Sequence, residues 1–234
     1  MGKPLKILLV DDEEGIKKIV QQILIKEGYN FLYAANGERA LDVFSSEDPA
    51  LIILDVMLPE IDGFEVCKTI RQSSNVPIIM LSAKSDIVDK SVGFNMGADD
   101  YLTKPFSPIE LSLRVKALIR RVVNRPLNKC EKKDWYLCMG GLEINCANYE
   151  VKLQGKIINF TPKEFDLLCF LVRNPGQVFT REQLYNQLWD EDLIGDTGTI
   201  TVFVRRIREK IEKDPAKPKY LQTVWGVGYK FCNM

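Results

Sequence analysis

Short apolar runs alternate with amphipathic segments through the first half of the chain. Near-continuous apolar runs of this kind are typical of strands that a parallel sheet buries on both faces. We expect strands at Leu5–Val10, Phe31–Ala34, Leu51–Leu54, Ile78–Leu81 and Tyr101–Thr103. Segments with helical spacing separate them, at Glu14–Glu27, Gly37–Ser46, Phe64–Gln72, Asp86–Met96 and Pro108–Val123. Five strand–helix units with right-handed crossovers predict a doubly wound α/β domain around a five-stranded parallel sheet.

The pattern of hydrophobic positions changes after a polar segment. We interpret 124–134, which contains Pro126 and several basic residues, as a linker between domains 1–123 and 135–234. Alternating segments then predict a small antiparallel sheet, with strands at Trp135–Met139, Leu142–Asn145, Glu150–Leu153 and Lys156–Phe160. Three helices are expected after it, from Thr161 to about Arg173, from Thr180 towards Trp189, and over about Thr197–Glu212, followed by a hairpin of Tyr220–Val224 and Gly228–Phe231. The second domain is therefore predicted to be α+β.

Composition narrows the class of protein. The 234 residues suffice for two domains, and no apolar run approaches the length that spans a bilayer. The N-terminal segment is too short and too acidic for a signal peptide, so we expect a cytoplasmic protein without a membrane partner. Six cysteines form no C-x-x-C pair and are expected to be buried thiols. The absence of histidine excludes a Ser-His-Asp triad, a His-ligated zinc and a His general base.

Chemically active side chains follow four of the predicted strands. Asp11 and Asp12 end the first strand, Asp55 the third, Ser82 the fourth and Lys104 the fifth. Open α/β sheets bind ligands beyond the carboxyl ends of their strands, so these groups should meet in one crevice. A hard divalent cation such as Mg²⁺ would offset the repulsion among the carboxylates, and an aspartate can act as the nucleophile of phosphoryl transfer. Singly, each residue is more simply a turn or surface residue; only their joint placement is specific.

Residues 3–123 resemble the receiver domain of response regulators, a flavodoxin-like fold. The matching strings are Ile7-Leu8-Leu9-Val10-Asp11-Asp12-Glu13, Asp55-Val56-Met57-Leu58-Pro59 with Asp62-Gly63, Leu81-Ser82-Ala83, and Gly97-Ala98-Asp99-Asp100-Tyr101-Leu102-Thr103-Lys104-Pro105-Phe106.

The receiver resemblance implies a role for each matching residue. Asp55 would be the phosphoacceptor and would hold Mg²⁺ together with Asp11, Asp12 and the backbone carbonyl of Met57. Lys104 would contact the phosphoryl group next to a cis bond to Pro105, and Ser82 and Tyr101 would form the switch pair. The phosphodonor would be a phosphohistidine on a sensor histidine kinase, which fits a chain with no histidine of its own.

A basic amphipathic helix marks the second domain. Basic side chains outnumber acidic ones from Arg205 to Lys219, while Ile200, Ile207 and Ile211 fall at helical spacing. An ordinary solvated helix would show the same pattern, but a helix ahead of a short hairpin also fits a winged helix-turn-helix.

Residues 135–234 are similar to the effector domain of the OmpR/PhoB family. The strings that carry this similarity are Phe160-Thr161-Pro162-Lys163-Glu164-Phe165-Asp166-Leu167-Leu168, Phe179-Thr180-Arg181-Glu182-Gln183-Leu184, Val204-Arg205-Arg206-Ile207-Arg208-Glu209-Lys210, and Thr223-Val224-Trp225-Gly226-Val227-Gly228-Tyr229-Lys230-Phe231. The similarity implies a recognition helix at Thr199–Glu212 and a wing at Trp225–Gly228. Residues implied to face the major groove are Thr201, Val202, Arg205 and Arg206; those implied to contact phosphates are Arg181, Lys210, Thr223 and Tyr229. Thr199 and Trp225 complete the implied DNA-binding set. Trp225 stands where many relatives carry arginine.

The resemblance also implies a homodimer formed on phosphorylation. Its charged pairs would be Lys90 with Glu110, Asp100 with Arg114, and Asp99 with Arg121. Exposed pairs are individually weak, so phosphorylation would shift an equilibrium towards the dimer. Such a regulator would bind promoter DNA and contact RNA polymerase, and its only catalysis would be phosphoryl transfer onto Asp55.

Three alternative functions would explain parts of this sequence pattern. A Mg²⁺-dependent phosphatase with an aspartyl nucleophile commonly carries a second acid two residues later, where this chain has Met57. A flavodoxin-like cofactor binder would need small residues where Asp11-Asp12-Glu13-Glu14 stands. A regulator that works without phosphorylation is a third reading, which the intact acidic set disfavours.

Overall fold

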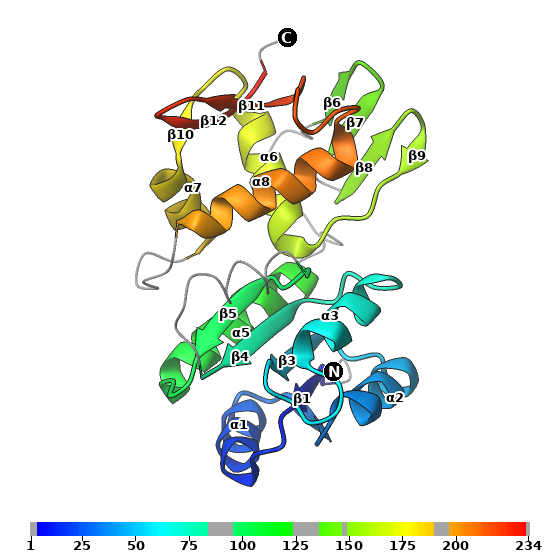
Figure 1. Cartoon of the computed structure of the whole chain (residues 1–234), viewed down its shortest axis with the longest axis vertical. Helices are drawn as coiled ribbons and strands as arrows, with labels where there is room; N and C mark the ends of the chain where they lie inside the picture. Colours follow the sequence, from blue (N-terminus) through cyan, green and yellow to red (C-terminus); the bar gives the residue numbers. More distant parts are fainter. Residues whose placement is uncertain (1–3, 84–95, 124–135, 147–148, 190–196, 233–234) are drawn as a thin grey trace. The chain divides into compact units, whose positions relative to one another are not determined.

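The chain forms two compact units, Met1–Val123 and Asn124–Met234 (Figure 1). The computed structural model describes residues 4–83, 96–123, 136–146, 149–189 and 197–232. The linker expected at 124–134 lies outside these residues, as does the helix expected at Asp86–Met96 apart from its last residue. Among the helices described, none combines the length and the apolar character needed to cross a bilayer.

The first unit is a five-stranded parallel sheet covered by helices. Its strands, in the spatial order β2-β1-β3-β4-β5, are β1 (Lys6–Val10), β2 (Asn30–Ala34), β3 (Leu51–Asp55), β4 (Ile78–Ser82) and β5 (Asp100–Thr103). The helices are α1 (Glu14–Lys26), α2 (Gly37–Glu47), α3 (Gly63–Arg71) and α5 (Pro108–Val123). The chain reverses its direction of travel across the sheet after β2, which confirms the doubly wound fold.

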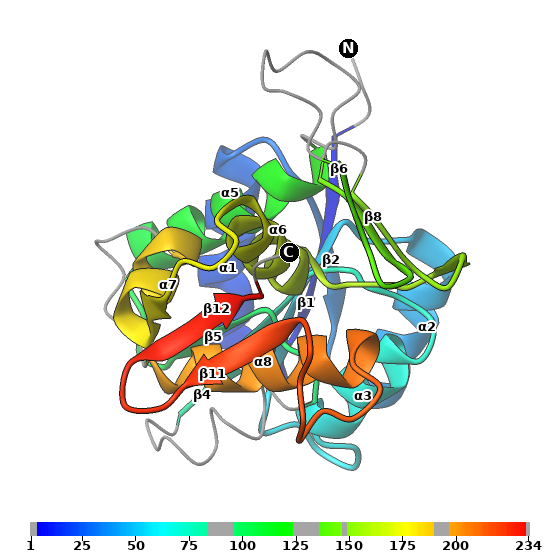
Figure 2. The ribbon, with the colours of Figure 1, turned by 90° about the horizontal axis from the view of Figure 1, so that it is seen from above.

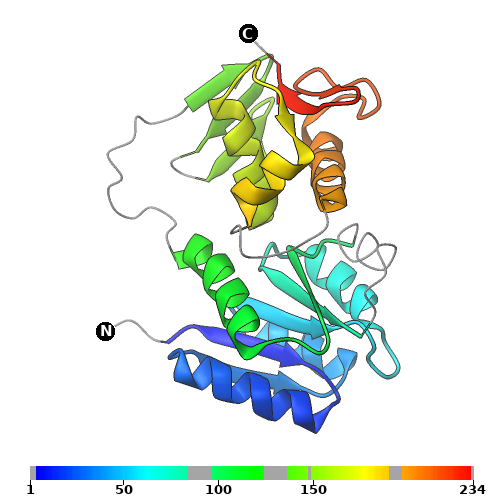
Figure 3. The ribbon, with the colours of Figure 1, turned by 90° about the vertical axis from the view of Figure 1, so that its left-hand side faces the viewer.

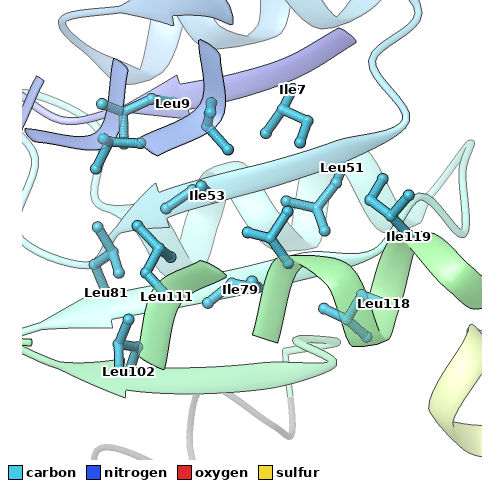
Figure 4. Close-up of a cluster of buried hydrophobic side chains, with 13 residues drawn as sticks. Ile7, Leu9, Leu51, Ile53, Ile79, Leu81, Leu102, Leu111, Leu118 and Ile119 are labelled. Atoms are coloured by element: carbon cyan, nitrogen blue, oxygen red, sulfur yellow. The ribbon is translucent and has the colours of Figure 1, made fainter. Parts of the chain in front are cut away.

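Alternation along the strands sends side chains to both faces of this sheet. Helices α1 and α5 lie on one face, with α2 and α3 on the other (Figure 2). On the α1–α5 face, strand side chains pack against Leu111 and Leu118 of α5 (Figure 4). The strand residues there are Ile7, Leu9, Leu51, Ile53, Ile79, Leu81 and Leu102. Because both faces are covered, the strands read as continuous apolar runs, and their polar groups are confined to the ends.

The second unit is α+β, as predicted. A four-stranded antiparallel sheet contains β6 (Tyr136–Met139), β7 (Leu142–Asn145), β8 (Glu150–Leu153) and β9 (Lys156–Ile157). Three helices follow, α6 (Pro162–Arg173), α7 (Arg181–Leu188) and α8 (Gly198–Ile211). A second sheet has the order β10-β12-β11, with β10 (Phe179–Thr180), β11 (Leu221–Val224) and β12 (Gly228–Phe231). Figure 3 shows α6 and α7 packed beside the orange α8.

Two local features of this unit differ from the expected pattern. Strand β9 ends at Ile157, whereas the sequence predicted a strand as far as Phe160. Strand β10 was not predicted, because two residues carry no periodicity and their pairing with β12 is distant in sequence. A Cβ on Gly228 would overlap the carbonyl oxygen of Phe179, so the close approach of β10 to β12 requires glycine at this position.

Candidate functional site

An acidic pocket forms where the strands of the first unit end. Asp11 follows β1 directly, Asp55 is the last residue of β3, and the two strands pair in parallel register. Carboxylate oxygens of Asp11, Asp12 and Asp55 all lie within 4.8 Å of one another. Asp11 and Asp55 are buried, whereas Asp12 is exposed. The fold therefore brings together the three acids that the sequence placed at two strand ends.

Lys104, directly after β5, is the cation of this pocket. Its Nζ lies 2.8 Å from Asp11 and 2.7 Å from Asp55, and it also lies 3.0 Å from Glu13, which the sequence did not single out. Burial disfavours its charge, but hydrogen bonds to the three carboxylates outweigh burial and raise the pKa of Lys104 above its usual value. Lys104 is therefore a permanent positive charge against the strand-end acids.

The donor set of the pocket fits a hard divalent cation. Burial raises the pKa of Asp11, although hydrogen bonds with Lys104 and the Glu13 amide oppose that shift. One lysine cannot balance Asp11, Asp12 and Asp55 together, so the pocket keeps excess negative charge on oxygen atoms alone. Oxygen ligands of this kind are those that Mg²⁺ prefers, and such an ion would neutralise charge developing on a phosphoryl group.

The remaining predicted receiver residues lie on β4 and β5 and in the segments that follow β3 and β5. The Met57 amide donates to Asp55 Oδ1 at 3.2 Å, and its side chain is exposed. Its carbonyl as a metal ligand stays a prediction. Ser82, the last residue of β4, is buried, and the ring of Tyr101 on β5 also lies inward. The bond between Lys104 and Pro105 is cis, which confirms the expected isomer.

Helix α3 approaches the backbone of Asp55 closely at Gly63. The side chain of Asp62 caps α3 by accepting a 2.8 Å hydrogen bond from the Glu65 amide, and Gly63 begins the helix against β3. A Cβ on Gly63 would fall well inside van der Waals contact with the carbonyl oxygen of Asp55. Helix α3 and the Asp55 backbone therefore approach each other closely only because residue 63 has no side chain.

Replacing Gly63 with alanine should displace Asp55 and weaken the first unit. We expect a loss of about 1–3 kcal/mol in the free energy of unfolding, as for other overpacked sites, measured by urea denaturation. Gly15→Ala is the matched control, because nothing lies within 4 Å of a Cβ at Gly15 in α1. Equal stability of the Gly63→Ala variant and the wild type would contradict this account.

The exposed face of α8 carries part of the predicted DNA-contact set. Thr201 and Arg205 are exposed, Val202 is half-buried, and Thr199 is buried. Arg205 Nε donates to Glu209 at 2.9 Å on the same exposed face. Of the predicted DNA contacts on α8, Thr201, Val202 and Arg205 thus share this face, together with Glu209.

Arg206 and Lys210 lie against α6 instead. The side chain of Glu164 is completely buried and lies 2.7 Å from Arg206 and 2.6 Å from Lys210. Glu164 also accepts a hydrogen bond from the Thr161 amide, which closes a capping box at the start of α6. Arg206, whose side chain is 11% exposed, therefore helps to hold α8 on α6.

The β11–β12 hairpin presents one exposed aromatic side chain. Trp225 is 90% exposed at the turn, where Gly226 has φ of 75°. Tyr229 is buried, and its hydroxyl lies 3.2 Å from Thr201 Oγ1 of α8. Thr223 accepts from Arg208, which also donates to the Leu221 carbonyl. Sequence reasoning did not assign Arg208 this role in holding α8 to the hairpin, because both bonds cross between separate elements.

Arg181 is exposed at the first position of α7. Thr180 accepts from the Gln183 amide at 3.1 Å, and Gln183 accepts from the Thr180 amide in return. This capping box fixes the start of the helix, where backbone N–H groups favour anions. Arg181 thus projects from an end of α7 that suits a phosphate contact.

Several charged residues were expected at a dimer interface. Those that the structure describes form ion pairs within the chain instead. The pattern predicted exposed charges, but Asp99, Asp100 and Arg114 are all buried. Asp99 lies 2.8 Å from Arg71 of α3.

Arg114 forms the second group of ion pairs within the first unit. Its guanidinium lies 2.7 Å from Asp100 and 2.9 Å from Glu110. Lys90 and the side chain of Arg121 lie outside the described residues.

Comparison with known proteins matches both units. The response regulator receiver domain matches residues 7–116, and the C-terminal domain of transcriptional regulatory proteins matches residues 155–231. The alkaline phosphatase synthesis transcriptional regulatory protein PhoP of Bacillus subtilis is 44% identical over 96% of this chain and 95% of its own. The chain belongs to the OmpR/PhoB family of response regulators.

Further relatives cover nearly the whole chain. The uncharacterized transcriptional regulatory protein YclJ of Bacillus subtilis is 45% identical over 97% of this chain and 99% of its own. The response regulator DrrB of Thermotoga maritima, an OmpR/PhoB homolog, is 37% identical with a TM-score of 0.52, covering 98% of this chain and 100% of its own. A RitR mutant is 25% identical with a TM-score of 0.72, covering 97% of this chain and 98% of its own. This regulator is therefore a two-component transcriptional regulator that combines a receiver with a DNA-binding domain.

Proposed function

We propose that a partner histidine kinase phosphorylates Asp55 of this regulator in a Mg²⁺-dependent reaction, and that phosphorylation promotes dimerisation and promoter binding. The observation that carries the proposal is the contact of Lys104 Nζ with both Asp11 and Asp55 beside Asp12. A nucleophilic oxygen, oxygen ligands for a cation and a fixed positive charge are the parts that phosphoryl transfer requires.

Each residue of the pocket would have its own role in phosphoryl transfer. An oxygen of Asp55 attacks the phosphorus of the donor's phosphohistidine; the new O–P bond forms as the P–N bond breaks, and the imidazole leaves with the bonding pair. Lys104, already 2.7 Å from Asp55, holds its positive charge beside the transferred group. Asp11 and Asp12 would hold Mg²⁺ with Asp55, and bound Mg²⁺ would supply charge neutralisation at the phosphoryl oxygens. The Ser82 hydroxyl, at the end of β4, would then bind a phosphoryl oxygen while Tyr101 keeps its ring inward.

Dimerisation would use β5 and α5, whose charged residues pair within the unit. Asp100 and Glu110 both contact Arg114 within the unit, so a partner subunit would have to exchange or extend these contacts. Because the Arg114–Asp100 pair is buried, its exchange has a cost that phosphorylation would have to offset, so the dimer would form only when the equilibrium is shifted. Two effector units brought together would bind adjacent promoter half-sites, from which the regulator would contact RNA polymerase.

Treatment of the full chain with acetyl phosphate tests the switch. We expect a mass increase of one phosphoryl group that requires Mg²⁺ and disappears with a chelator. Sedimentation of the same samples should show a shift from monomer to dimer. A protein that stays unlabelled in Mg²⁺ would refute the acceptor site, whereas a labelled protein that stays monomeric would refute the dimer alone.

DNA binding should depend steeply on salt. Lys and Arg contacts to phosphates release counterions, so we expect affinity to fall roughly 100-fold or more between low and moderate salt. Arg181→Ala, at the exposed start of α7, removes an expected phosphate contact, so it should weaken binding and reduce the salt slope by about one. Lys18→Ala, exposed on α1, is the control and should leave the slope unchanged. A flat salt response measured by fluorescence anisotropy would contradict the basic helix as the contact surface.

A further inference from the structure

Glu13 is a further acidic residue beside the strand-end pocket, and the proposed phosphoryl transfer gives it no role. It is the N-cap residue of α1, yet its side chain makes no capping hydrogen bond with the described first turn of that helix. Instead, Glu13 Oε1 accepts a hydrogen bond from Lys104 Nζ at 3.0 Å, across 91 positions of the sequence. The side chain of Glu13 therefore serves the cation of the pocket rather than the start of the helix.

Carboxylates surround the ammonium group of Lys104. Asp11, Asp55 and Glu13 lie 2.8, 2.7 and 3.0 Å from Nζ, and the lysine side chain is only 10% exposed. An ammonium group carries three N–H donors and no acceptor. A phosphoryl oxygen on Asp55 can therefore bind Lys104 only if the lysine gives up one of these three contacts.

The burial of the three carboxylates decides which contact is given up at the least cost. The side chains of Asp11 and Asp55 are 0% and 4% exposed, whereas that of Glu13 is 61% exposed. Asp11 also accepts a 2.9 Å hydrogen bond from the Glu13 amide, which holds the aspartate in place. A buried carboxylate that loses its cation stays uncompensated, but an exposed one is solvated by water. Glu13 is therefore the partner that Lys104 can release most easily.

We propose that Glu13 is a displaceable partner of Lys104, which occupies a donor of the ammonium group before phosphorylation and yields it to the phosphoryl group on Asp55. This role rests on the proposed phosphorylation of Asp55. The released carboxylate turns into solvent, and Lys104 keeps three oxygen partners in both states. Glu13 is thus a positioning residue that acts through Lys104. It opposes phosphorylation, because its contact must be broken each time the pocket is filled.

Substitution of Glu13 with glutamine tests this role in the full chain. The amide keeps the size of the side chain but competes only weakly for the ammonium group, so a phosphoryl group should bind more easily. Because the contact is exposed, we expect the acetyl phosphate concentration that gives half-maximal labelling to fall about two- to five-fold. Calorimetric titration with beryllofluoride in Mg²⁺, which mimics the phosphoryl group without reaction, should show an affinity gain of the same factor. A merely structural role for Glu13 would give the opposite result, weaker binding in the variant.

Glu14→Gln is the matched control, because it removes the same charge from the next residue. The side chain of Glu14 is 64% exposed and pairs with Lys17 at 2.6 Å, so the ion pair that it loses lies on α1. Its half-maximal donor concentration and its beryllofluoride affinity should match those of the wild type.

The two glutamine variants also separate this role from the acceptor site. Equal gains in both variants would show that general repulsion of anions is responsible, and no gain in Glu13→Gln would likewise overturn the role of Glu13. In both cases a wild type that is still labelled would leave the acceptor site intact. A wild type that takes up no phosphate would refute the acceptor site, and the role of Glu13 with it.

Discussion

Asp55→Asn will fold normally and take up no phosphate from acetyl phosphate. The amide keeps the size of the carboxylate but lacks its nucleophilic oxygen, so labelling should fall to background. Lys104 retains Asp11 and Glu13 as partners, at 2.8 and 3.0 Å. The substitution also removes the nearby negative charge of Asp55, which contributes to the raised pKa of Asp11. The folded state should therefore lose little stability, and the loss of labelling would report chemistry.

Asp48→Asn is the matched control for the acceptor substitution. Asp48 is exposed after α2 and has φ of 46°, a conformation that asparagine adopts readily. This variant should be labelled at the wild-type rate, measured by intact-mass spectrometry in the presence of Mg²⁺. Undiminished labelling of Asp55→Asn would show that another residue is the acceptor, and peptide mapping would locate it.

Glu164→Gln will destabilise the second unit severely. The carboxylate is fully buried and serves Arg206, Lys210 and the Thr161 amide at once. Glutamine is nearly the same shape, but it removes the negative charge and turns N–H donors towards two cations. Removing one partner from a buried ion pair costs about 3–5 kcal/mol, because the remaining charge stays buried without compensation. Urea denaturation followed by the fluorescence of the second unit should show this loss.

Glu209→Gln is the control for Glu164→Gln, because it removes the same charge from an exposed ion pair of α8. Glu209 pairs with Arg205 at 2.9 Å, but its side chain is 48% exposed. Water screens such a pair, so its removal should change stability by no more than about 0.5 kcal/mol. If both glutamine variants unfolded at the same urea concentration, the buried cluster would not be what holds α8 on α6.

Local pattern determined much of the fold and of the pocket. The apolar runs fixed where strands lie, and the residues directly after them, Asp11, Asp55 and Lys104, had to meet because parallel strands end at one edge. Hydrophobic periodicity and capping signals depend on neighbours in the sequence, so a single chain suffices to identify them. The strings shared with response regulators then predicted the family.

Tertiary structure alone decided which charges pair. The sequence placed Arg206 on a basic helix, but only packing of α8 on α6 shows that it binds Glu164. The same holds for Asp99 with Arg71. Each contact joins residues far apart along the chain, and periodicity specifies which face of an element is buried without specifying the partner that it meets there.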